Sequence, residues 1–379
     1  MTKIVFNRKE FTRAIDYCMT SIEKKSALPI LSSILVEVKD GICKFISTNL
    51  ETSVITKITA LEFENEITLA IPANYVSNLC RVIKGELIYF DYDAEHMLLN
   101  ITAEKSKYNV PCADYNDFPS VIYEENEGSP VDVKKIANFF KKMSFSMTEV
   151  NVNKAYSGVL IIKPADNEMN LEMVTTDIHR ISVLTLKNTQ LNVNDINSGI
   201  VIVGKNFSEI QKIFTDEVNV TAFVNEGKVT IKSENVIFIS RLIKNEFPNY
   251  RSVTGTVESI EQKSFALINR KELIDAIKRV IVLNTDEKIW ATKFEFRGNT
   301  LSLTANAEFG GNSSDEILIE KGFESDRTIG INAKYLLDVL SVLDCSEVRI
   351  IAEEGLRPLS VVESAEDFYY IHMIMPLRI

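Results

Sequence analysis

Asn7-Arg8-Lys9-Glu10-Phe11 and Asn269-Arg270-Lys271-Glu272-Leu273 share the tetrapeptide Asn-Arg-Lys-Glu, and Asp132-Val133-Lys134-Lys135-Ile136 opens a third segment of the same kind. Each segment begins with Asn or Asp, residues that cap helix N-termini, and continues as an amphipathic helix. A second series of helix openings lies at residues 71–75, 203–207 and 331–335. Within each series the members recur after roughly 125 to 135 residues, which is the size of a domain. We therefore predict three copies of one unit.

Short runs rich in Val, Ile, Thr, Phe and Tyr separate these helices and are typical of β-strands. Turn-forming triplets join several of them into hairpins, at Lys39-Asp40-Gly41, Asn225-Glu226-Gly227 and Arg297-Gly298-Asn299. Each unit is therefore predicted to be α+β, with two helices packed on an antiparallel sheet. The expected strands are 31–38, 42–47, 219–224, 228–232, 294–296 and 300–305.

Two polar, turn-rich segments divide the chain. They lie at residues 124–130 and 252–259, and such segments are typical of domain boundaries. We predict three domains, at residues 1–125, 126–253 and 254–379.

Composition indicates a folded, cytoplasmic protein. Hydrophobic residues make up 45% of the 379 residues and charged residues 25%, which is ordinary for a globular chain. The first ten residues contain no apolar signal segment, and no apolar run is long enough to span a membrane. The five cysteines form no Cys-x-x-Cys pair and are expected to be reduced, mostly buried thiols. No membrane partner is predicted.

The basic residues concentrate in the predicted helices. Six helical segments carry 16 basic and 9 acidic residues, a net of +7, although the whole chain carries −11 and the remainder therefore −18. For any one helix, a solvated face explains the charge. Six helices with the same bias favour a basic lining inside an acidic exterior, which would attract phosphates without reading base sequence.

The sequence predicts no catalytic, cofactor or metal site. His96, His179 and His372 do not lie at metal-ligand spacing with another His or Cys. The segment Gly199-Ile200-Val201-Ile202-Val203-Gly204-Lys205-Asn206 comes close to a phosphate-binding loop. Its apolar interior predicts a strand instead, and Asn206 replaces the Ser or Thr that would hold Mg²⁺.

The C-terminal tail is Met373-Ile374-Met375-Pro376-Leu377-Arg378-Ile379. This apolar segment is compatible either with a terminal strand docked into a sheet or with one wall of a binding groove. Both readings stay open at this point.

Six short stretches stand in a characteristic order and spacing along the chain. They are Ala27-Leu28-Pro29-Ile30-Leu31, Ser47-Thr48-Asn49-Leu50-Glu51, Asp117-Phe118-Pro119, Thr176-Asp177-Ile178-His179-Arg180, Phe247-Pro248-Asn249-Tyr250-Arg251 and Met375-Pro376-Leu377-Arg378-Ile379. By these stretches the chain resembles the bacterial DNA polymerase III beta subunit, the sliding clamp family, over essentially its full length.

This resemblance implies a non-catalytic processivity factor without a cofactor. Two chains would associate head to tail into a closed ring of six domains around duplex DNA. Edge strands of the first and third domains would pair across the joint. The residues implied at the joint are Lys107, Tyr108, Val110, Ile281, Val282 and Leu283.

The implied DNA contacts do not depend on base sequence. By position in the family they are Lys25, Arg81, Lys84, Lys141, Lys154, Lys205, Lys278 and Lys334.

The resemblance also implies a groove between the second and third domains that binds short partner peptides. The partners would be the DNA polymerase III alpha subunit, the clamp loader, and repair polymerases or mismatch-repair proteins. Family members often have Gly at the position of Ile178, a cation near Ser252 and a smaller residue at Tyr156. The implied lining is Tyr156, Thr176, Ile178, His179, Arg180, Ile181, Pro248, Val253, Pro358, Met373, Ile374, Met375, Pro376, Leu377 and Arg378.

Two other classes of protein compete with this interpretation. A monomeric, acidic interaction scaffold would explain the repeats but not the basic helices or the joint. A hydrolase on a β-rich fold would need a catalytic constellation, and the sequence offers none.

Overall fold

The computed structural model describes residues 2–23, 28–123, 127–148, 153–164, 170–187, 199–284, 289–307 and 310–378. The chain forms two compact units. The first comprises Met1–Lys134 and Asn206–Leu242, and the second comprises Lys135–Lys205 and Ile243–Ile379. All strand pairs of the described residues are antiparallel, as the sequence predicts.

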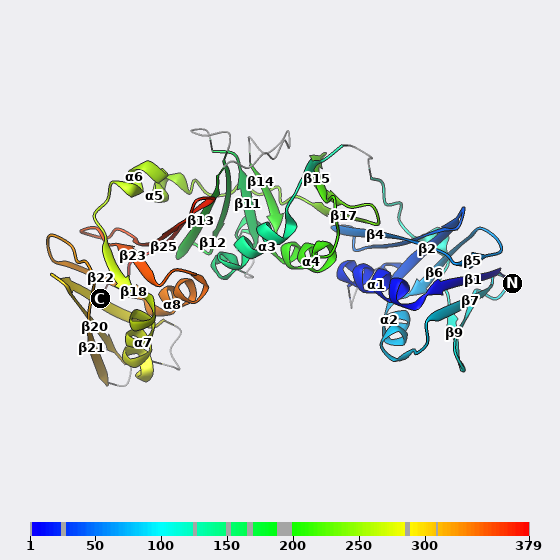
Figure 1. Ribbon diagram of the computed structural model, residues 1–379, viewed down its shortest axis with the longest axis horizontal. Coiled ribbons are helices and arrows are strands. Elements are labelled where there is room, and N and C mark those ends of the chain that lie inside the picture. The colour runs from blue at the N-terminus through cyan, green and yellow to red at the C-terminus, as the bar shows by residue number, and fades with distance from the viewer. Residues whose placement is uncertain are drawn as a thin grey trace. The chain divides into compact units, whose positions relative to one another are not determined.

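The first unit contains a five-stranded and an eight-stranded sheet (Figure 1). The five-stranded sheet has the order β5 (Glu62–Phe63), β1 (Thr2–Asn7), β7 (Leu87–Asp93), β8 (Leu98–Ala103) and β9 (Ser106–Pro111). The eight-stranded sheet has the order β10 (Ser129–Pro130), β15 (Thr221–Asn225), β16 (Lys228–Lys232), β17 (Val236–Arg241), β4 (Thr52–Thr59), β3 (Ile42–Thr48), β2 (Ser33–Lys39) and β6 (Ile67–Pro72).

The second unit contains an eight-stranded and a four-stranded sheet. The eight-stranded sheet has the order β14 (Ile200–Val203), β11 (Gly158–Ile162), β12 (Leu171–Thr176), β13 (Arg180–Leu186), β25 (Phe368–Ile374), β24 (Leu359–Ser364), β23 (Glu347–Ile351) and β18 (Ala266–Asn269). The four-stranded sheet has the order β21 (Asn312–Leu318), β20 (Thr300–Asn306), β19 (Ala291–Arg297) and β22 (Arg327–Asn332).

Each eight-stranded sheet draws its strands from two successive repeats. In the first unit, β17 pairs with β4, so that Val236 lies opposite Thr56. In the second unit, β13 pairs with β25, so that Arg180 lies opposite Ile374. The sheets therefore continue from one repeat into the next, an arrangement that the sequence analysis does not predict.

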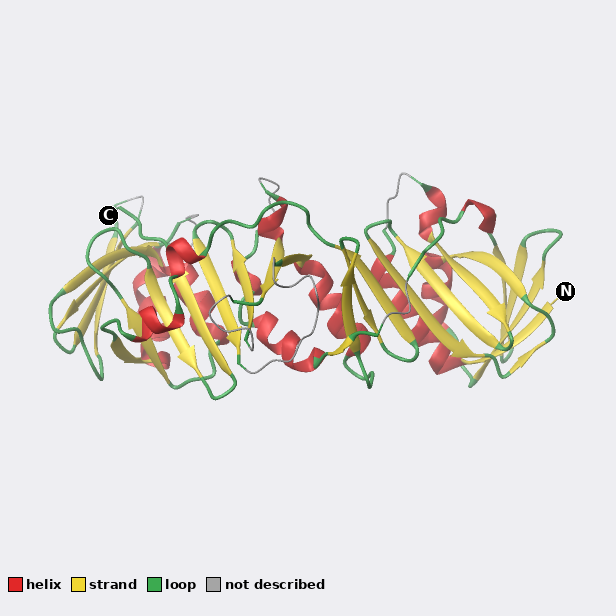
Figure 2. Ribbon diagram, turned by 90° about the horizontal axis from the view of Figure 1, so that it is seen from above, coloured by secondary structure: helices red, strands yellow, loops and turns green. Residues whose placement is uncertain are grey.

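The longer helices pack against the sheets, and Figure 2 shows them behind the strands within each unit. α1 and α2 lie side by side in the first unit, and α7 and α8 in the second. The α-helices are α1 (Arg8–Cys18), α2 (Ala73–Val82), α3 (Val133–Lys141), α4 (Gly204–Phe214), α5 (Arg251–Thr254), α6 (Val257–Glu261), α7 (Arg270–Val280) and α8 (Ala333–Val342).

The shared Asn-Arg-Lys-Glu motif caps two helices in the same way. The Asn7 side chain accepts hydrogen bonds from the backbone N–H groups of Lys9 and Glu10 at the start of α1. The Asn269 side chain does the same for Lys271 and Glu272 at the start of α7. The predicted N-caps of these two helices are confirmed, and such a cap contributes about 1 kcal/mol of stability.

The core of the first unit is aromatic at its centre. The rings of Phe6, Phe11, Phe45 and Phe90 are buried, with centroids 5.0 to 6.0 Å apart. They come from β1, α1, β3 and β7, so that one cluster joins both sheets to the first helix. A ring pair of this kind adds about 0.5–1.5 kcal/mol beyond its buried area.

Several local predictions are confirmed. Residues 200–203 form a strand of the second eight-stranded sheet rather than a phosphate-binding loop. The triplet Asn225-Glu226-Gly227 makes a tight turn between β15 and β16, with positive φ at Glu226 and Gly227. All five cysteines are free, and burial raises the pKa of Cys18 and Cys43 to about 12, which leaves these thiols unreactive. Among the described residues, no helix has the length and apolar character that crossing a membrane requires.

Candidate functional site

The turn between β12 and β13 is built by side chains that bond to its own backbone. Thr176 Oγ1 accepts a hydrogen bond from Ile178 N (3.1 Å) and donates one to Arg180 O (2.8 Å). Asp177 Oδ1 accepts from His179 N (3.1 Å) and Arg180 N (3.0 Å). Thr and Asp stabilise turns in this way because their short side chains reach nearby N–H groups. The turn therefore holds Ile178 and His179 outward at the end of a hairpin.

Ile178 adopts a backbone conformation that L-residues with a branched Cβ rarely take. Its φ is 79°, and its side chain is 56% exposed. Glycine takes this conformation without steric cost, which gives a physical reason for the glycine that the resemblance places here. The turn keeps its left-handed backbone at this position although the residue is Ile178, and the aliphatic side chain is therefore exposed on the surface.

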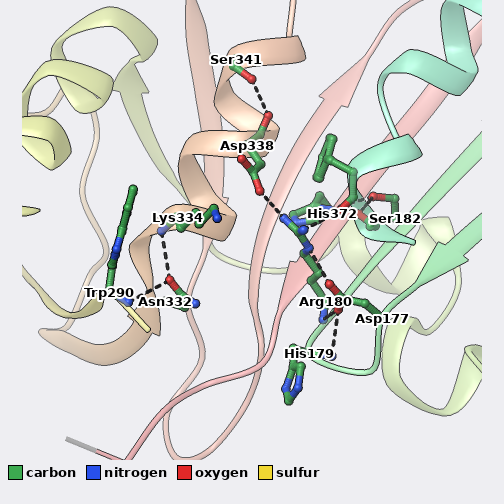
Figure 3. Close-up of polar contacts among 12 residues, drawn as sticks. Asp177, His179, Arg180, Ser182, Trp290, Asn332, Lys334, Asp338, Ser341 and His372 are labelled. Carbon is green, nitrogen blue, oxygen red and sulfur yellow. Dashed lines mark hydrogen bonds and ion pairs between the residues drawn. The ribbon is translucent and has the colours of Figure 1, made fainter. Parts of the chain in front are cut away.

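Arg180 is the most heavily bonded residue of the site. Its guanidinium donates to Asp177 Oδ2 (2.9 Å), to Asp338 Oδ2 (2.6 Å) and to the carbonyl oxygen of Phe145. Its Cζ also lies 4.3 Å from the ring centroid of Tyr335. Figure 3 shows Arg180 lying between Asp177 and Asp338. These bonds, all within the second unit, fix α8 relative to the 176–180 turn, which makes Arg180 a structural residue that positions the surface above it.

The C-terminal tail is tied to this turn. Its strand β25 pairs with β13, and Met375 N then donates to His179 O (2.9 Å). Two residues later, Leu377 N donates to Gly330 O of β22 (2.7 Å). The tail is therefore a docked strand followed by an anchored extension, and Met375 lies beside His179 on the surface.

The predicted groove residues divide into an outer and a buried set. Thr176, Arg180, Ile181, Met373 and Ile374 are buried. Met373, with only 2% exposure, packs in the core with Ile181, so its expected exposure as a groove wall is wrong. Strand β25 continues through Ile374 inside the sheet, and the tail reaches the surface only at Met375. The outer set is Tyr156, Ile178, His179, Pro248, Val253, Pro358, Met375, Pro376, Leu377 and Arg378.

The segment after the second repeat is bonded to the same sheet. Tyr250 Oη donates to Glu172 Oε2 (2.6 Å), and Arg251 Nη2 donates to Glu172 Oε1 (2.8 Å). Phe247 packs against the core beneath. These contacts carry Pro248 and Val253 to the surface of the second unit, and Ser252 is exposed beside Val253.

A buried polar group lies below Arg180. His372 Nδ1 lies 2.8 Å from Ser182 Oγ, which also contacts Ser146 Oγ at 2.8 Å, and Figure 3 shows the His372–Ser182 pair. His372 Nε2 is buried and has no hydrogen-bond partner among the described residues. Burial, and then the positive charge of Arg180, lower the pKa of His372 well below its usual value.

The predicted DNA-contacting cations that the structure describes are exposed and lie at helix ends. Lys205 opens α4 and Lys278 lies in the last turn of α7. Lys84, Lys141, Lys154, Lys205 and Lys278 form no ion pair with any residue in the described ranges. Burial raises the pKa of the Asp16 carboxyl above its usual value, and the nearby positive charge of Arg81 offsets part of that rise. Lys334 Nζ lies 5.8 Å from the ring centroid of Trp290. Lys25 falls outside the described residues.

Other basic residues of the same helices are neutralised. Lys142 is buried and bonded to Glu363 (2.7 Å) and Asp344 (2.8 Å), and Lys135 pairs with Asp367 (2.7 Å). Arg13 pairs with Glu217. Lys134 and Lys141 of α3 are exposed, whereas Lys135 and the following Lys142 are paired with carboxylates.

The residues predicted at the joint lie on or beside strands that are outermost in their sheets among the described residues. Lys107, Tyr108 and Val110 belong to β9, the last strand of the five-stranded sheet. The short helix Ile281–Leu283 lies beside β21, the last strand of the four-stranded sheet. Val282 and Leu283 are 60% and 52% exposed, whereas Ile281 and Val110 are buried.

The residues that hold Arg180 are not predicted from the sequence. Tyr335 and Asp338 lie three positions apart on α8 and meet Arg180 together, and the His179 ring stacks on Tyr335 at 6.5 Å. Residues three positions apart lie on the same face of a helix, so the sequence does indicate that Tyr335 and Asp338 could contact one partner together. Nothing in the sequence says that their partner is Arg180, which lies 158 residues before Asp338.

Three sequence profiles of the DNA polymerase III beta subunit match the chain in order. The N-terminal domain matches residues 2–122, the central domain 130–249 and the C-terminal domain 260–378. The fold prediction is therefore confirmed as three α+β clamp domains with antiparallel sheets.

Individual relatives agree over the whole chain. The chain is 26% identical to the beta sliding clamp of Rickettsia bellii over 400 residues, covering 100% of each chain. It is 24% identical to the beta sliding clamp of Pseudomonas aeruginosa over 362 residues, covering 94% of this chain and 95% of the relative. The crystal structure of the beta subunit from DNA polymerase of Streptococcus pyogenes has the same fold, with a TM-score of 0.88, 22% identity and 100% coverage of both chains.

Proposed function

The chain belongs to the DNA polymerase III beta subunit family, and on this premise we propose that it is a non-catalytic DNA sliding clamp in the cytoplasm. As a closed ring around duplex DNA it would keep the replicative polymerase on its template. The observation that carries the proposal is the ordered match of all three family domains along one chain. The matched segments each fall inside one of the proposed domains, 1–125, 126–253 and 254–379.

The ring would form from two copies of the chain joined head to tail. An exposed strand edge is satisfied when another strand pairs with it, and β9 and β21 are both free at one side in the described chain. Val282 and Leu283 add apolar surface beside one of these edges. Because the two edges differ, the contact would be heterologous, and two such contacts close a dimeric ring.

DNA would be held by diffuse charge. The unpaired cations Lys84, Lys141, Lys154, Lys205 and Lys278 support this proposal, because uncompensated charge at helix ends attracts phosphates. We propose the same role for Lys25, Arg81 and Lys334.

Topological retention on DNA tests the proposal. The chain is loaded on nicked circular DNA, and half of the sample is then linearised before gel filtration. We expect the protein to stay with the circle and to leave the linear molecule, because a ring slides off a free end. Equal retention on both forms would show that the protein binds DNA by ordinary contact.

Partner peptides would bind the surface formed by the 176–180 turn and the tail. Exposed Ile178, Val253 and Met375 support it, since apolar anchors at such a surface provide most of the binding energy. The polymerase alpha subunit, the clamp loader, and repair polymerases or mismatch-repair proteins are the proposed partners. Deleting residues 375–379 should abolish binding of a fluorescent polymerase-derived peptide and leave the dimer intact. Wild-type affinity in the truncated chain, measured by anisotropy, would contradict the assignment.

A further inference from the structure

The first unit contains a cavity of about 120 Å³ at the end of the β3–β4 hairpin. Leu50, Glu51 and Pro119 line one part of it, and Lys228, Ile239 and Arg241 line another. A cavity of about 150 Å³ accommodates a benzene molecule, so this one is large enough for a single aliphatic side chain. No role proposed above involves this cavity.

The turn beside this cavity repeats the 176–180 turn bond for bond. Thr48 Oγ1 accepts from Leu50 N (3.0 Å) and donates to Thr52 O (3.2 Å). Asn49 Oδ1 accepts from Glu51 N (3.1 Å) and Thr52 N (2.7 Å). Leu50 has φ 72° and is 46% exposed, so it corresponds to Ile178 in backbone and in exposure.

The strand register shows that β17 beside the 48–52 turn corresponds to β25 and the tail beside the 176–180 turn. Arg241 N donates to Glu51 O (2.9 Å), as Met375 N donates to His179 O (2.9 Å), so Arg241 takes the place of Met375. Ile239 lies opposite Ser53, as Met373 lies opposite Ile181.

The pairing of β16 with β17 gives the position of Lys228, the second cation of the cavity. Lys228 lies opposite Arg241 on the neighbouring strand, and the register of β24 with β25 puts Pro358 at the equivalent position. The cavity is therefore the first unit's copy of the proposed peptide surface, with two cations in place of Pro358 and Met375.

Lys228 and Arg241 outnumber Glu51, the carboxylate that lines the cavity, and make the copy chemically different from the surface at the tail. Like charges directly opposite each other on adjacent strands are destabilising. In the described part of the chain, neither Lys228 nor Arg241 has an ion-pair partner. A bound anion between them would remove the repulsion. Beside them, Leu50 and Ile122, the latter 76% exposed, offer apolar contact.

We propose that this cavity binds an acidic peptide segment of a partner protein. An aliphatic side chain of the peptide enters the cavity next to Leu50, and flanking carboxylates pair with Lys228 and Arg241. The inference rests on the proposed function in one respect: it assumes that partner proteins bind this chain through short peptides. The two surfaces differ in charge, because the proposed peptide surface at the tail has Pro358 and Met375 where the cavity has Lys228 and Arg241.

A pair of peptides tests the proposal on the full chain. The probe is fluorescein-labelled Gly-Ser-Asp-Leu-Asp-Leu-Gly, and its neutral partner has Asn in place of both Asp residues. Binding is measured by anisotropy at low salt to the wild type and to the double variant Lys228→Gln/Arg241→Gln. The matched control, Lys39→Gln/Lys44→Gln, removes two cations from the same sheet outside the cavity. Leu50→Asp and the deletion of residues 375–379 complete the set.

We expect the acidic peptide to bind at least tenfold more weakly to Lys228→Gln/Arg241→Gln and to Leu50→Asp. The control and the truncated chain should bind like the wild type, and the neutral peptide should bind at least tenfold more weakly to the wild type. Absence of binding to the wild type, equal binding by Lys228→Gln/Arg241→Gln, or loss of binding on truncation would overturn the inference. Each of these results leaves retention on circular DNA unaffected, so failure of the ring proposal is recognised separately.

Discussion

At the scale of single residues, Ile178 combines an unfavourable backbone with an exposed side chain. Left-handed backbone costs an L-residue about 1–2 kcal/mol, and the side chain recovers little because more than half of it is exposed. The four hydrogen bonds of Thr176 and Asp177 keep the turn in this conformation. Strain retained at an exposed position is consistent with a binding role for the side chain.

We predict that Ile178→Gly stabilises the fold by on the order of 0.5–1 kcal/mol, because relief of the left-handed strain exceeds the extra chain entropy of glycine. Ile178→Val keeps the branched Cβ and should show no gain. Urea unfolding midpoints of the three proteins measure the difference. A glycine variant less stable than the wild type would mean that the Ile178 side chain makes stabilising contacts.

The sequence predicts the exposed residues of the 176–180 turn and the tail better than the buried contacts that hold them in place. The resemblance identifies the exposed residues Ile178, His179 and Met375, since they lie in contiguous motifs. It does not identify the bonds of Arg180 to Asp338 and Phe145, because these join segments far apart in the chain. A left-handed backbone at Ile178 also cannot be read from residue type, which argues against it.

His372 makes stability depend on pH. Its pKa in the folded chain is depressed, so the unfolded chain binds a proton that the folded chain does not. The contribution of this group to the free energy of unfolding is fully present above its pKa in the unfolded chain, about 6.5. It is lost as the pH falls toward the lower pKa that the group has in the folded chain. Between pH 7.5 and pH 5.5 this should cost about 1.4 kcal/mol.

Replacing His372 with Gln should remove this part of the pH dependence. The variant is expected to be less stable at neutral pH, because Ser182 loses one of its hydrogen-bond partners, His372 Nδ1 at 2.8 Å. The informative quantity is the change in unfolding free energy between pH 7.5 and pH 5.5, which should be smaller in the variant. Identical slopes in the wild type and His372→Gln would assign the effect to other groups.

At the scale of elements, strands and turns follow from local sequence, whereas the partners of the strands do not. Residues 228–232 are predicted and observed as a strand, and the Asn225-Glu226-Gly227 turn is confirmed by its positive φ angles. The pairing of β17 with β4 and of β13 with β25 is not predicted. Apolar alternation specifies which face of a strand is buried but not which edge it meets.

Helix α4 offers a matched test of the DNA contacts. Lys205 in its first turn has no ion-pair partner in the described chain, whereas Lys212 in its last turn is bonded to Glu209 at 3.1 Å. Lys205→Gln should reduce the steepness of log K against log salt by about 0.9 for duplex DNA. Lys212→Gln changes the net charge equally and should leave the slope nearly unchanged. Equal slopes in both variants would mean that overall charge, rather than position, governs binding.

At the scale of the whole molecule, an acidic chain must bind an acidic polymer. The net charge of −11 opposes association with DNA in general, so the proposed DNA contacts depend on the local positive charge of the unpaired cations. Encirclement relieves the demand for tight binding, since a closed ring cannot dissociate sideways. Weak, salt-sensitive contact is then compatible with long residence on DNA, provided that the ring stays closed. The stability of the joint therefore matters more than the strength of any DNA contact.

The exposed residues next to β21 provide the test of that joint. Burying a Val or Leu side chain contributes roughly 1.5–3 kcal/mol, and a buried unpaired carboxylate costs several kcal/mol more. We therefore expect Val282→Asp/Leu283→Asp to sediment as a monomer at a concentration where the wild type is a dimer. Val218→Asp, at a valine that is also exposed but lies far from either edge strand in sequence, should remain dimeric. The monomer should also leave nicked circular DNA as quickly as linear DNA, because an open chain has no topological hold. A double variant that stays dimeric would place the joint elsewhere on the chain.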